Sequence, residues 1–189
     1  MIRIGVVGAI GSGKSYIANL FGYPVFNADS EVAKIYKTNK NCFKRMKKNL
    51  PKHFSSFPAS KIQIIKAIED SEINLKKITK IIHPEIRKKL SIFLKKNKKR
   101  KAVILDIPLL LENRLNQKSD IIVFVQSKKS DIIKKLKERD NFNLNLYNQF
   151  KKIQSPLSYK KKNSNYIIKN NFTNNFAKIS VKKILKEII

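Results

Sequence analysis

Short apolar runs and longer amphipathic stretches alternate along the chain. The short runs have the length and apolar content of buried strands, and the longer stretches have the spacing of amphipathic helices. Five runs are expected to be strands: residues 2–7, 24–27, 102–107, 121–125 and 166–169. Because strands that alternate with helices are typical of α/β proteins, the pattern predicts a mostly parallel five-stranded sheet flanked by helices.

The helices that should cover this sheet follow its strands directly. The first is expected to begin near Lys14 and to end at Phe21, where Gly22 provides a stop signal. A second helical segment spans about residues 128–162, and a last helix spans 176–189. Each segment therefore has an apolar side available for packing on the sheet.

The stretch between the second and third strands differs from the rest. Residues 30–100 contain no convincing strand and have the pattern of several lysine-rich amphipathic helices. Asp29 or Ser30 is expected to cap the first of them, and one helix is expected to start at His83 and Pro84. The sequence therefore predicts a helical insertion between these two strands.

Length and composition set limits on the class of protein. A chain of 189 residues suits one compact domain that carries a smaller inserted part. No apolar run approaches the roughly 18 residues of a membrane span, and the first strand has no signal-peptide pattern. A single cysteine, Cys42, excludes an internal disulfide and fits a reducing compartment. We therefore predict a cytoplasmic protein.

The chain is strongly basic, with a formal net charge of +29. Such a charge can indicate binding to nucleic acid or to a membrane surface. Here lysine is spread over the whole chain together with abundant asparagine and isoleucine, and the codons of all three are rich in A and T. Base composition therefore accounts for much of the excess, although a positive field still attracts polyanions such as nucleotides.

The first strand leads into a phosphate-binding loop. Gly8, Gly13, Lys14 and Ser15 match the pattern G-x-x-x-x-G-K-[ST], with a strand before it and a helix after it. The backbone N–H groups of such a loop surround a β-phosphate, the lysine reaches the β- and γ-oxygens, and the serine hydroxyl ligates Mg²⁺. We therefore predict a Mg²⁺-dependent ATP site formed by Gly8, Gly11, Ser12, Gly13, Lys14, Ser15 and Tyr16.

A phosphate loop alone does not distinguish a kinase from a GTPase or an ATP-driven machine. The chain has no Asn-Lys-x-Asp motif for reading guanine, and its length leaves little room for the sensor regions of a motor. An RNA-binding ATPase is a further alternative, but the aromatic residues are scattered and there is no tryptophan. We therefore favour a kinase and expect no specific nucleic-acid partner.

The sequence PVFNADSEV places Asp29 just after the second strand. The carboxyl ends of parallel strands face the same crevice, so Asp29 should lie opposite the phosphate loop. There it could accept the proton of an acceptor hydroxyl. Aspartate is also a good helix N-cap, and spacing alone leaves both roles open.

Five segments of the chain together resemble one kinase family: GAIGSGKS, PVFNADSEVAK, HPEIRKKL, DIPLLLEN and QSPLSYKKKNSNYIIKNN. In order and spacing they resemble the dephospho-CoA kinase family over nearly the whole chain. The resemblance implies transfer of the γ-phosphate of ATP to the ribose 3′-hydroxyl of dephospho-CoA, the last step of coenzyme A synthesis. The alternative is another small-metabolite or nucleoside monophosphate kinase with the same phosphate loop.

The resemblance also implies three parts within this single kinase domain. They are a nucleotide-binding core of about residues 1–29, 101–138 and 164–189, a helical CoA domain of about 30–100, and a helical lid of about 139–163. It assigns Asp29 as general base and places four further residues near the acceptor: His83, Arg87, Leu110 and Glu112. Other roles remain open for these residues: His83 could cap a helix, Arg87 could be exposed to solvent on its helix, and Leu110 could belong to the core.

Further expectations concern the metal, which follows from the position of Asp106 in the sequence, and the lid, which follows from the resemblance. Asp106 ends an apolar strand and would hold Mg²⁺ together with Ser15. Arg139 would fold over the ATP phosphates as part of the lid, although it could instead pair with Glu138 or Asp140. In the lid, lysines at 160–162 stand where an arginine is expected, and they keep the charge without its bidentate geometry.

Overall fold

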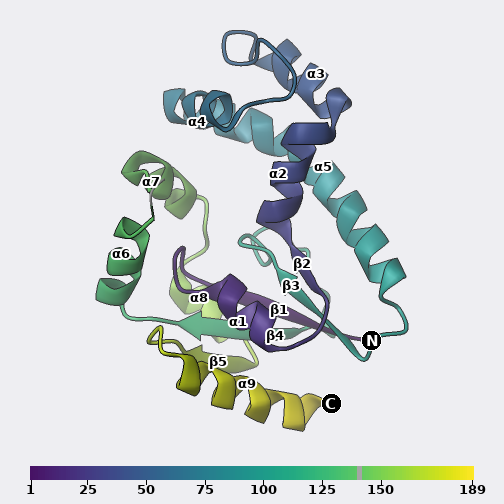
Figure 1. Ribbon diagram of the computed structural model, residues 1–189, viewed down its shortest axis with the longest axis vertical. Helices are drawn as coiled ribbons and strands as arrows, with labels where there is room; N and C mark the ends of the chain where they lie inside the picture. Colours follow the sequence, from purple (N-terminus) through teal and green to yellow (C-terminus); the bar gives the residue numbers. More distant parts are fainter. Residues whose placement is uncertain (140–141) are drawn as a thin grey trace.

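Five parallel strands form the centre of the molecule (Figure 1). The structure is a computed structural model that describes residues 1–139 and 142–189. The strand order across the sheet is β2-β3-β1-β4-β5, and every neighbouring pair is parallel. The strands are β1 (Ile2–Gly8), β2 (Val25–Asn27), β3 (Ala102–Asp106), β4 (Ile121–Gln126) and β5 (Tyr166–Lys169). The predicted five-stranded α/β fold is therefore confirmed.

The central strands are largely apolar because helices and loops cover both faces of the sheet. Every residue of β3 is buried, including Asp106 at its carboxyl end. On one face, α1 (Lys14–Leu20) and α9 (Asn174–Ile188) pack together against the sheet. Their buried contacts are Ile17, Ala18, Ala177, Val181 and Ile184.

The helical insertion packs around a second hydrophobic core, on the other face of the sheet, and extends away from the sheet (Figure 1). It consists of α2 (Ala28–Thr38), α3 (Lys40–Asn49), α4 (Lys61–Asp70) and α5 (Glu72–Lys96). As predicted, the residues between β2 and β3 form helices and no strand. Because α2 starts directly after β2, its first turn lies at the carboxyl end of the sheet.

The prediction that a helix starts at His83 and Pro84 is wrong. These residues lie inside α5, which begins at Glu72 after the N-cap Ser71. The hydroxyl of Ser71 accepts a hydrogen bond from the backbone N–H of Ile73 at 3.0 Å. Buried residues continue on both sides of the proline, so packing outweighs the one backbone hydrogen bond that proline cannot donate.

The segment after β4 was expected to be one helical stretch, but the structure divides it. It forms α6 (Lys129–Lys137), α7 (Leu144–Lys152) and α8 (Leu157–Lys162). Asn143 starts α7 by accepting a hydrogen bond from Leu146 N, and Pro156 precedes α8. Figure 1 shows α7 beside α4, where Asn143 Nδ2 donates to Glu69 Oε1 at 2.7 Å. The segment thereby meets the insertion across the carboxyl end of the sheet.

No helix in the described part of the chain has the length and apolar content needed to cross a bilayer.

Candidate active site

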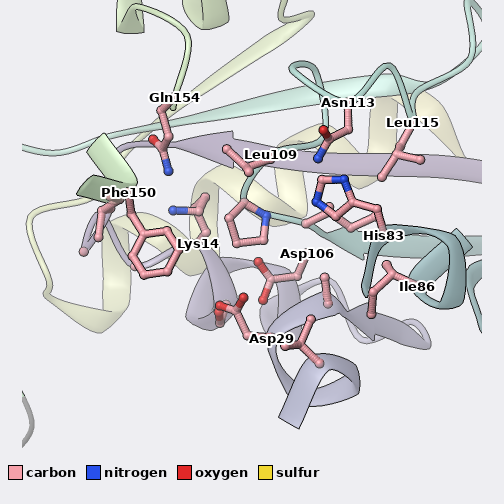
Figure 2. A pocket seen from close by; sticks show the side chains of 18 of the residues that line it. Lys14, Asp29, His83, Ile86, Asp106, Leu109, Asn113, Leu115, Phe150 and Gln154 are labelled. Atoms are coloured by element: carbon pink, nitrogen blue, oxygen red, sulfur yellow. The ribbon is translucent and has the colours of Figure 1, made fainter. Parts of the chain in front are cut away.

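A cavity of about 600 Å³ lies where the sheet, the helical insertion and the α6–α8 segment meet. It is lined by phosphate-loop residues, namely Gly11, Gly13, Lys14, Ser15 and Tyr16. It is also lined by residues from four other parts of the chain, namely Asp29, His83, Arg87, Asp106 and Arg139. The structure therefore brings most of the predicted site residues to one place (Figure 2).

The phosphate loop depends on backbone conformations that glycine adopts easily. Gly13 precedes α1 with a φ of 86°, in the left-handed region. A Cβ atom at Gly13 would lie 2.4 Å from Nδ2 of Asn170, so this position has no room for a side chain. Gly8 and Ser12 form the base of the loop and do not line the cavity, where the sequence expected ATP contacts from them.

Two side chains from other strands hold the back of the loop. Asn170, just after β5, donates from Nδ2 to the carbonyl of Ser12 at 2.9 Å. Ser127, just after β4, donates its hydroxyl to the same carbonyl at 3.1 Å. These contacts keep the Ser12 carbonyl turned toward the sheet, so the loop is preorganised for binding an anion.

Lys14 is held inside the cavity as a poorly solvated cation. Its side chain lies in the loop, where Nζ donates to the carbonyl of Ala9 at 2.7 Å, and the residue is only 9% exposed. Burial lowers the pKa of Lys14 to about 8, while the carboxylates of Asp106 and Asp29 act in the opposite direction. A triphosphate would supply the negative charge that this ammonium group otherwise lacks.

Asp29 does not cap its helix. The N-cap of α2 is Asn27, whose Oδ1 accepts a hydrogen bond from Ser30 N at 2.7 Å. Asp29 lies in the first turn and lines the cavity. Burial raises the pKa of the Asp29 carboxyl, the charge of Asp106 raises it further, and Lys14 lowers it. These opposing effects are those expected for a carboxylate that faces both groups.

Asp106 is fixed in the cavity wall by the same asparagine. Nδ2 of Asn27 donates to Oδ2 of Asp106 at 2.6 Å, across the adjacent ends of β2 and β3. Asp106 is 2% exposed, yet it lines the cavity together with Ser15. Asn27 therefore both starts the helix that carries Asp29 and orients the second carboxylate of the site.

We expect the Asn27→Ala variant to lose about 2 kcal/mol of unfolding free energy, since it removes both a helix cap and a charge-assisted hydrogen bond. Asn27→Asp is the matched variant, because it keeps the cap but places a carboxylate against Asp106. Repulsion from Asp106 would raise the folded-state pKa of the new carboxyl above its unfolded value. The stability deficit of Asn27→Asp should therefore shrink as the pH falls from 7 to 5 in urea unfolding, whereas that of Asn27→Ala should stay nearly constant.

His83 and Arg87 line the cavity from α5 (Figure 2 labels the former). Burial lowers the pKa of His83, and the positive charge of Arg87 lowers it further. The imidazole is therefore neutral at pH 7, with one donor and one acceptor nitrogen. Arg87 donates from Nη2 to the carbonyl of Asn113 at 3.0 Å, which anchors α5 to the loop after β3.

Leu110 and Glu112, which the resemblance placed beside the acceptor, do not line the cavity. Leu110 is completely buried and would contact any Cβ placed at Gly5, so it belongs to the core under the loop after β3. Glu112 turns to α8 and accepts from Lys160 Nζ at 2.9 Å. Lys160, the first of the three lid lysines, is itself completely buried in this ion pair.

Arg139 and Tyr16 lie at the open side of the cavity, and both residues are exposed. Glu138 and Asp140 were the alternative partners considered for Arg139. Glu138 pairs with Lys135 instead, with 2.8 Å between Lys135 Nζ and Glu138 Oε2. The other, Asp140, lies outside the described residues. Arg139 also contributes to the lowered pKa of Lys14, as expected for a cation near the phosphate loop.

Several cavity residues were not recognised in the sequence, among them Asn113, Phe150 and Gln154. Phe150 and Gln154 reach the cavity from the α7 region, and Asn113 reaches it from the loop after β3 (Figure 2). Gln154 and Asn113 do fall in the quoted segments QSPLSYKKK and DIPLLLEN, but nothing in those segments showed which side chain turns inward. Phe150 has no local signal beyond the apolar face of its helix.

Carboxylates from neighbouring strand ends face a phosphate loop with a buried lysine, and helices close the other side. A parallel sheet of this kind with such a cavity defines a phosphate-loop kinase that acts on a small molecule. The family profile described as dephospho-CoA kinase matches residues 2–175. The chain belongs to the dephospho-CoA kinase family.

Similar proteins agree with this assignment. A dephospho-CoA kinase of Wolbachia sp. subsp. Brugia malayi is 32% identical over 190 residues, covering 98% of this chain and 97% of the relative. One of Rickettsia typhi is 32% identical over 157 residues, covering 82% and 80%. The solved structure of TT1252 from Thermus thermophilus superposes with a TM-score of 0.79 at 24% identity, covering 100% of this chain and 98% of the other. At that identity the structural likeness shows the fold.

Proposed function

We propose that this cavity is where the chain transfers the γ-phosphoryl group of ATP to the ribose 3′-hydroxyl of dephospho-CoA. The observation that carries the proposal is the placement of Asp29 and Lys14 on one cavity, where each affects the pKa of the other. A base and a phosphate-binding cation that share a cavity can act on the two ends of one phosphoryl transfer. Membership of the dephospho-CoA kinase family supplies the identity of the acceptor.

In the proposed mechanism, Asp29 orients the 3′-hydroxyl and accepts its proton. The hydroxyl oxygen forms a bond to the γ-phosphorus while the bond from that phosphorus to the β,γ-bridging oxygen breaks, so ADP leaves with the electron pair. Lys14 stays near the β- and γ-oxygens and stabilises the charge on them. The raised pKa of Asp29 makes it a stronger base than an exposed aspartate.

The polar residues beside this centre suit Mg²⁺ as the cofactor. The Ser15 hydroxyl and the Asp106 carboxylate line the same cavity and are hard oxygen ligands. No cluster of three or more metal-binding side chains exists among the described residues, which suits an ion held mainly by phosphates and water. When bound, Mg²⁺ would neutralise charge on the β- and γ-phosphates.

The rest of the cavity offers subsites for the two substrates. Gly11, Gly13 and Ser15 of the loop would bind ATP phosphates through their backbone N–H groups, with Tyr16 and Arg139 at the open side. Neutral His83 and charged Arg87 would meet the acceptor at the other end. Since α7 touches the insertion through exposed contacts, we infer that the segment can move away as a lid to admit substrates. A buried free thiol at Cys42 fits our proposal of a cytoplasmic location.

The acceptor is tested by mixing the protein with ATP, Mg²⁺ and one acceptor at a time, and measuring ADP release and the phosphorylated product. We expect turnover with dephospho-CoA and none above background with AMP, CMP or shikimate. Turnover with one of the other acceptors would support a different small-molecule kinase. Stimulation of ATP hydrolysis by RNA instead would favour the nucleic-acid alternative.

A further inference from the structure

A fully buried lysine lies beneath the turn between α7 and α8. Nζ of Lys160 is 2.9 Å from Glu112 Oε1 and 3.2 Å from Gln154 Oε1, with the carbonyl of Pro108 at 3.5 Å. Lys160 is 0% exposed, and an ammonium group at such a place is stable only when oxygen acceptors surround it. The lysine therefore fixes the relative positions of these acceptors.

This contact determines how the amide of Gln154 is turned. An ammonium group can only donate hydrogen bonds, so the atom of Gln154 that faces Lys160 must be the carbonyl oxygen, Oε1. The amide nitrogen Nε2 is then at the opposite corner of the group. Gln154 lines the cavity, and Figure 2 shows Nε2 on the side of Lys14. Two N–H donors are thus presented to the phosphate-loop end of the cavity.

The backbone next to Gln154 is held by the same acid. Oε1 of Glu112 accepts a hydrogen bond from the backbone N–H of Ser155 at 2.9 Å as well as one from Lys160. Glu112 therefore anchors the main chain at the α7–α8 turn, while Lys160 anchors the Gln154 side chain. With both held, the amide is preorganised before any substrate arrives.

We propose that Gln154 is a further catalytic residue, whose Nε2–H donates to an oxygen of the γ-phosphoryl group during transfer. Lys160 and Glu112 act through it as positioning residues. This role rests on the proposed function, because the reaction that the donor assists is the phosphoryl transfer proposed above. A neutral donor there would stabilise the transferring group without adding a further positive charge near the already poorly solvated Lys14.

Nucleotide binding provides a test that needs no acceptor. For Gln154→Ala we expect unchanged affinity for ADP and about tenfold weaker affinity for an ATP analogue with a non-cleavable β,γ-bridge, measured by titration calorimetry. Turnover with dephospho-CoA should fall by about 10², the effect of losing one oriented donor. Gln154→Glu should stay folded, because Lys160 can pair with the new carboxylate, yet it should lose more turnover because that carboxylate faces the phosphates.

The matched control is Lys151→Met, which removes an exposed lysine of α7 and should change neither affinity nor turnover by more than about twofold. If Gln154→Ala binds the analogue and turns over like the unmodified protein, the proposed contact does not exist. If the unmodified protein fails to phosphorylate dephospho-CoA while Gln154→Ala still loses affinity only for the analogue, the acceptor is wrong but the γ-phosphoryl contact stands.

The positioning role is tested by removing the ion pair as a unit. Lys160→Met alone should unfold readily, because Glu112 would remain buried without its cation. The double variant Lys160→Met/Glu112→Leu replaces both charges by apolar groups and should fold. We expect its turnover to fall nearly as far as that of Gln154→Ala, with little further loss when all three changes are combined. Near-normal turnover of the double variant would show that the ion pair is only structural. The same conclusion would follow if the loss of turnover in the triple variant equalled the product of the losses in the double variant and in Gln154→Ala.

Discussion

Replacement of Asp29 by asparagine is expected to lower turnover with dephospho-CoA by about 10² or more, the usual range for loss of a general base. Affinity for ATP should change little, because Asp29 reaches the cavity from α2 and is not part of the phosphate loop. The variant keeps the shape of the side chain but cannot accept the proton of the hydroxyl. Steady-state kinetics and nucleotide titration measure the two quantities separately.

The same variant should not be destabilised. The folded-state pKa of Asp29 is raised above its unfolded value, so the folded protein binds more protons between the two values, and stability falls as the pH rises through that window. Removing the carboxylate removes this cost at pH 7. We therefore expect the melting temperature of the substrate-free variant to be equal or higher. A loss of turnover could then not be attributed to unfolding.

Asp131 provides a matched control for Asp29. Both acids lie in the first turn of a helix, where they interact favourably with its dipole, but Asp131 lies in α6 and does not line the cavity. Asp131→Asn should therefore leave turnover nearly unchanged. In the unmodified protein the acidic limb of the pH–rate profile should lie above the ordinary aspartate range, and Asp29→Asn should lack it. Equal rates for both variants would leave Asp29 without a role in proton transfer.

The parts of the fold that the sequence predicted are those specified by local pattern. The five strands lie within a residue of their expected bounds, because continuous apolar runs at this length are typical of a parallel sheet. The phosphate loop could be placed with its strand and helix because its glycines and Lys14 form a contiguous motif. Parallel topology then brought Asp29 and Asp106 to the same cavity, since Asp29 follows β2 and Asp106 ends β3.

What the sequence did not predict depends on contacts between distant segments. Glu112 was expected near the acceptor and Lys160 was expected in the lid, and only their burial against one another shows that they pair with each other away from the cavity. The inward turn of Gln154 follows from that pair, so it could not be inferred before the pair was known. Asn27 is different: asparagine is a preferred N-cap, and its position two residues before Asp29 could have indicated its role.

Replacement of Lys14 by methionine should abolish transfer and at the same time stabilise the substrate-free protein. Without its ammonium group the loop loses the cation that reaches the β- and γ-oxygens, so turnover should fall to background. The effect on stability follows from the pKa. Lys14 has a folded-state pKa of about 8 against 10.5 in the unfolded, solvent-exposed chain, so the folded protein binds fewer protons between these values and gains stability as the pH rises through them.

At pH 7 the charge on Lys14 therefore costs the folded protein about 3 kcal/mol, from the difference of 2.5 pKa units between 10.5 and 8. Methionine removes this cost but also loses the hydrogen bond to the carbonyl of Ala9, worth about 1 kcal/mol. The variant should thus gain about 2 kcal/mol in urea unfolding at pH 7, and the gain should shrink toward pH 10. The exposed Lys137→Met is the control, with an expected change of less than about 0.5 kcal/mol.

ATP should reverse this order of stability. A triphosphate beside the ammonium group provides the negative charge that burial withholds, so ATP should raise the melting temperature of the unmodified protein much more than that of Lys14→Met. This outcome would mean that the loop holds an unfavourable charge in the empty site and recovers the free energy on binding. A variant that turned over at nearly the normal rate would remove Lys14 from the mechanism, and one less stable at pH 7 would show that the buried ammonium group is not costly.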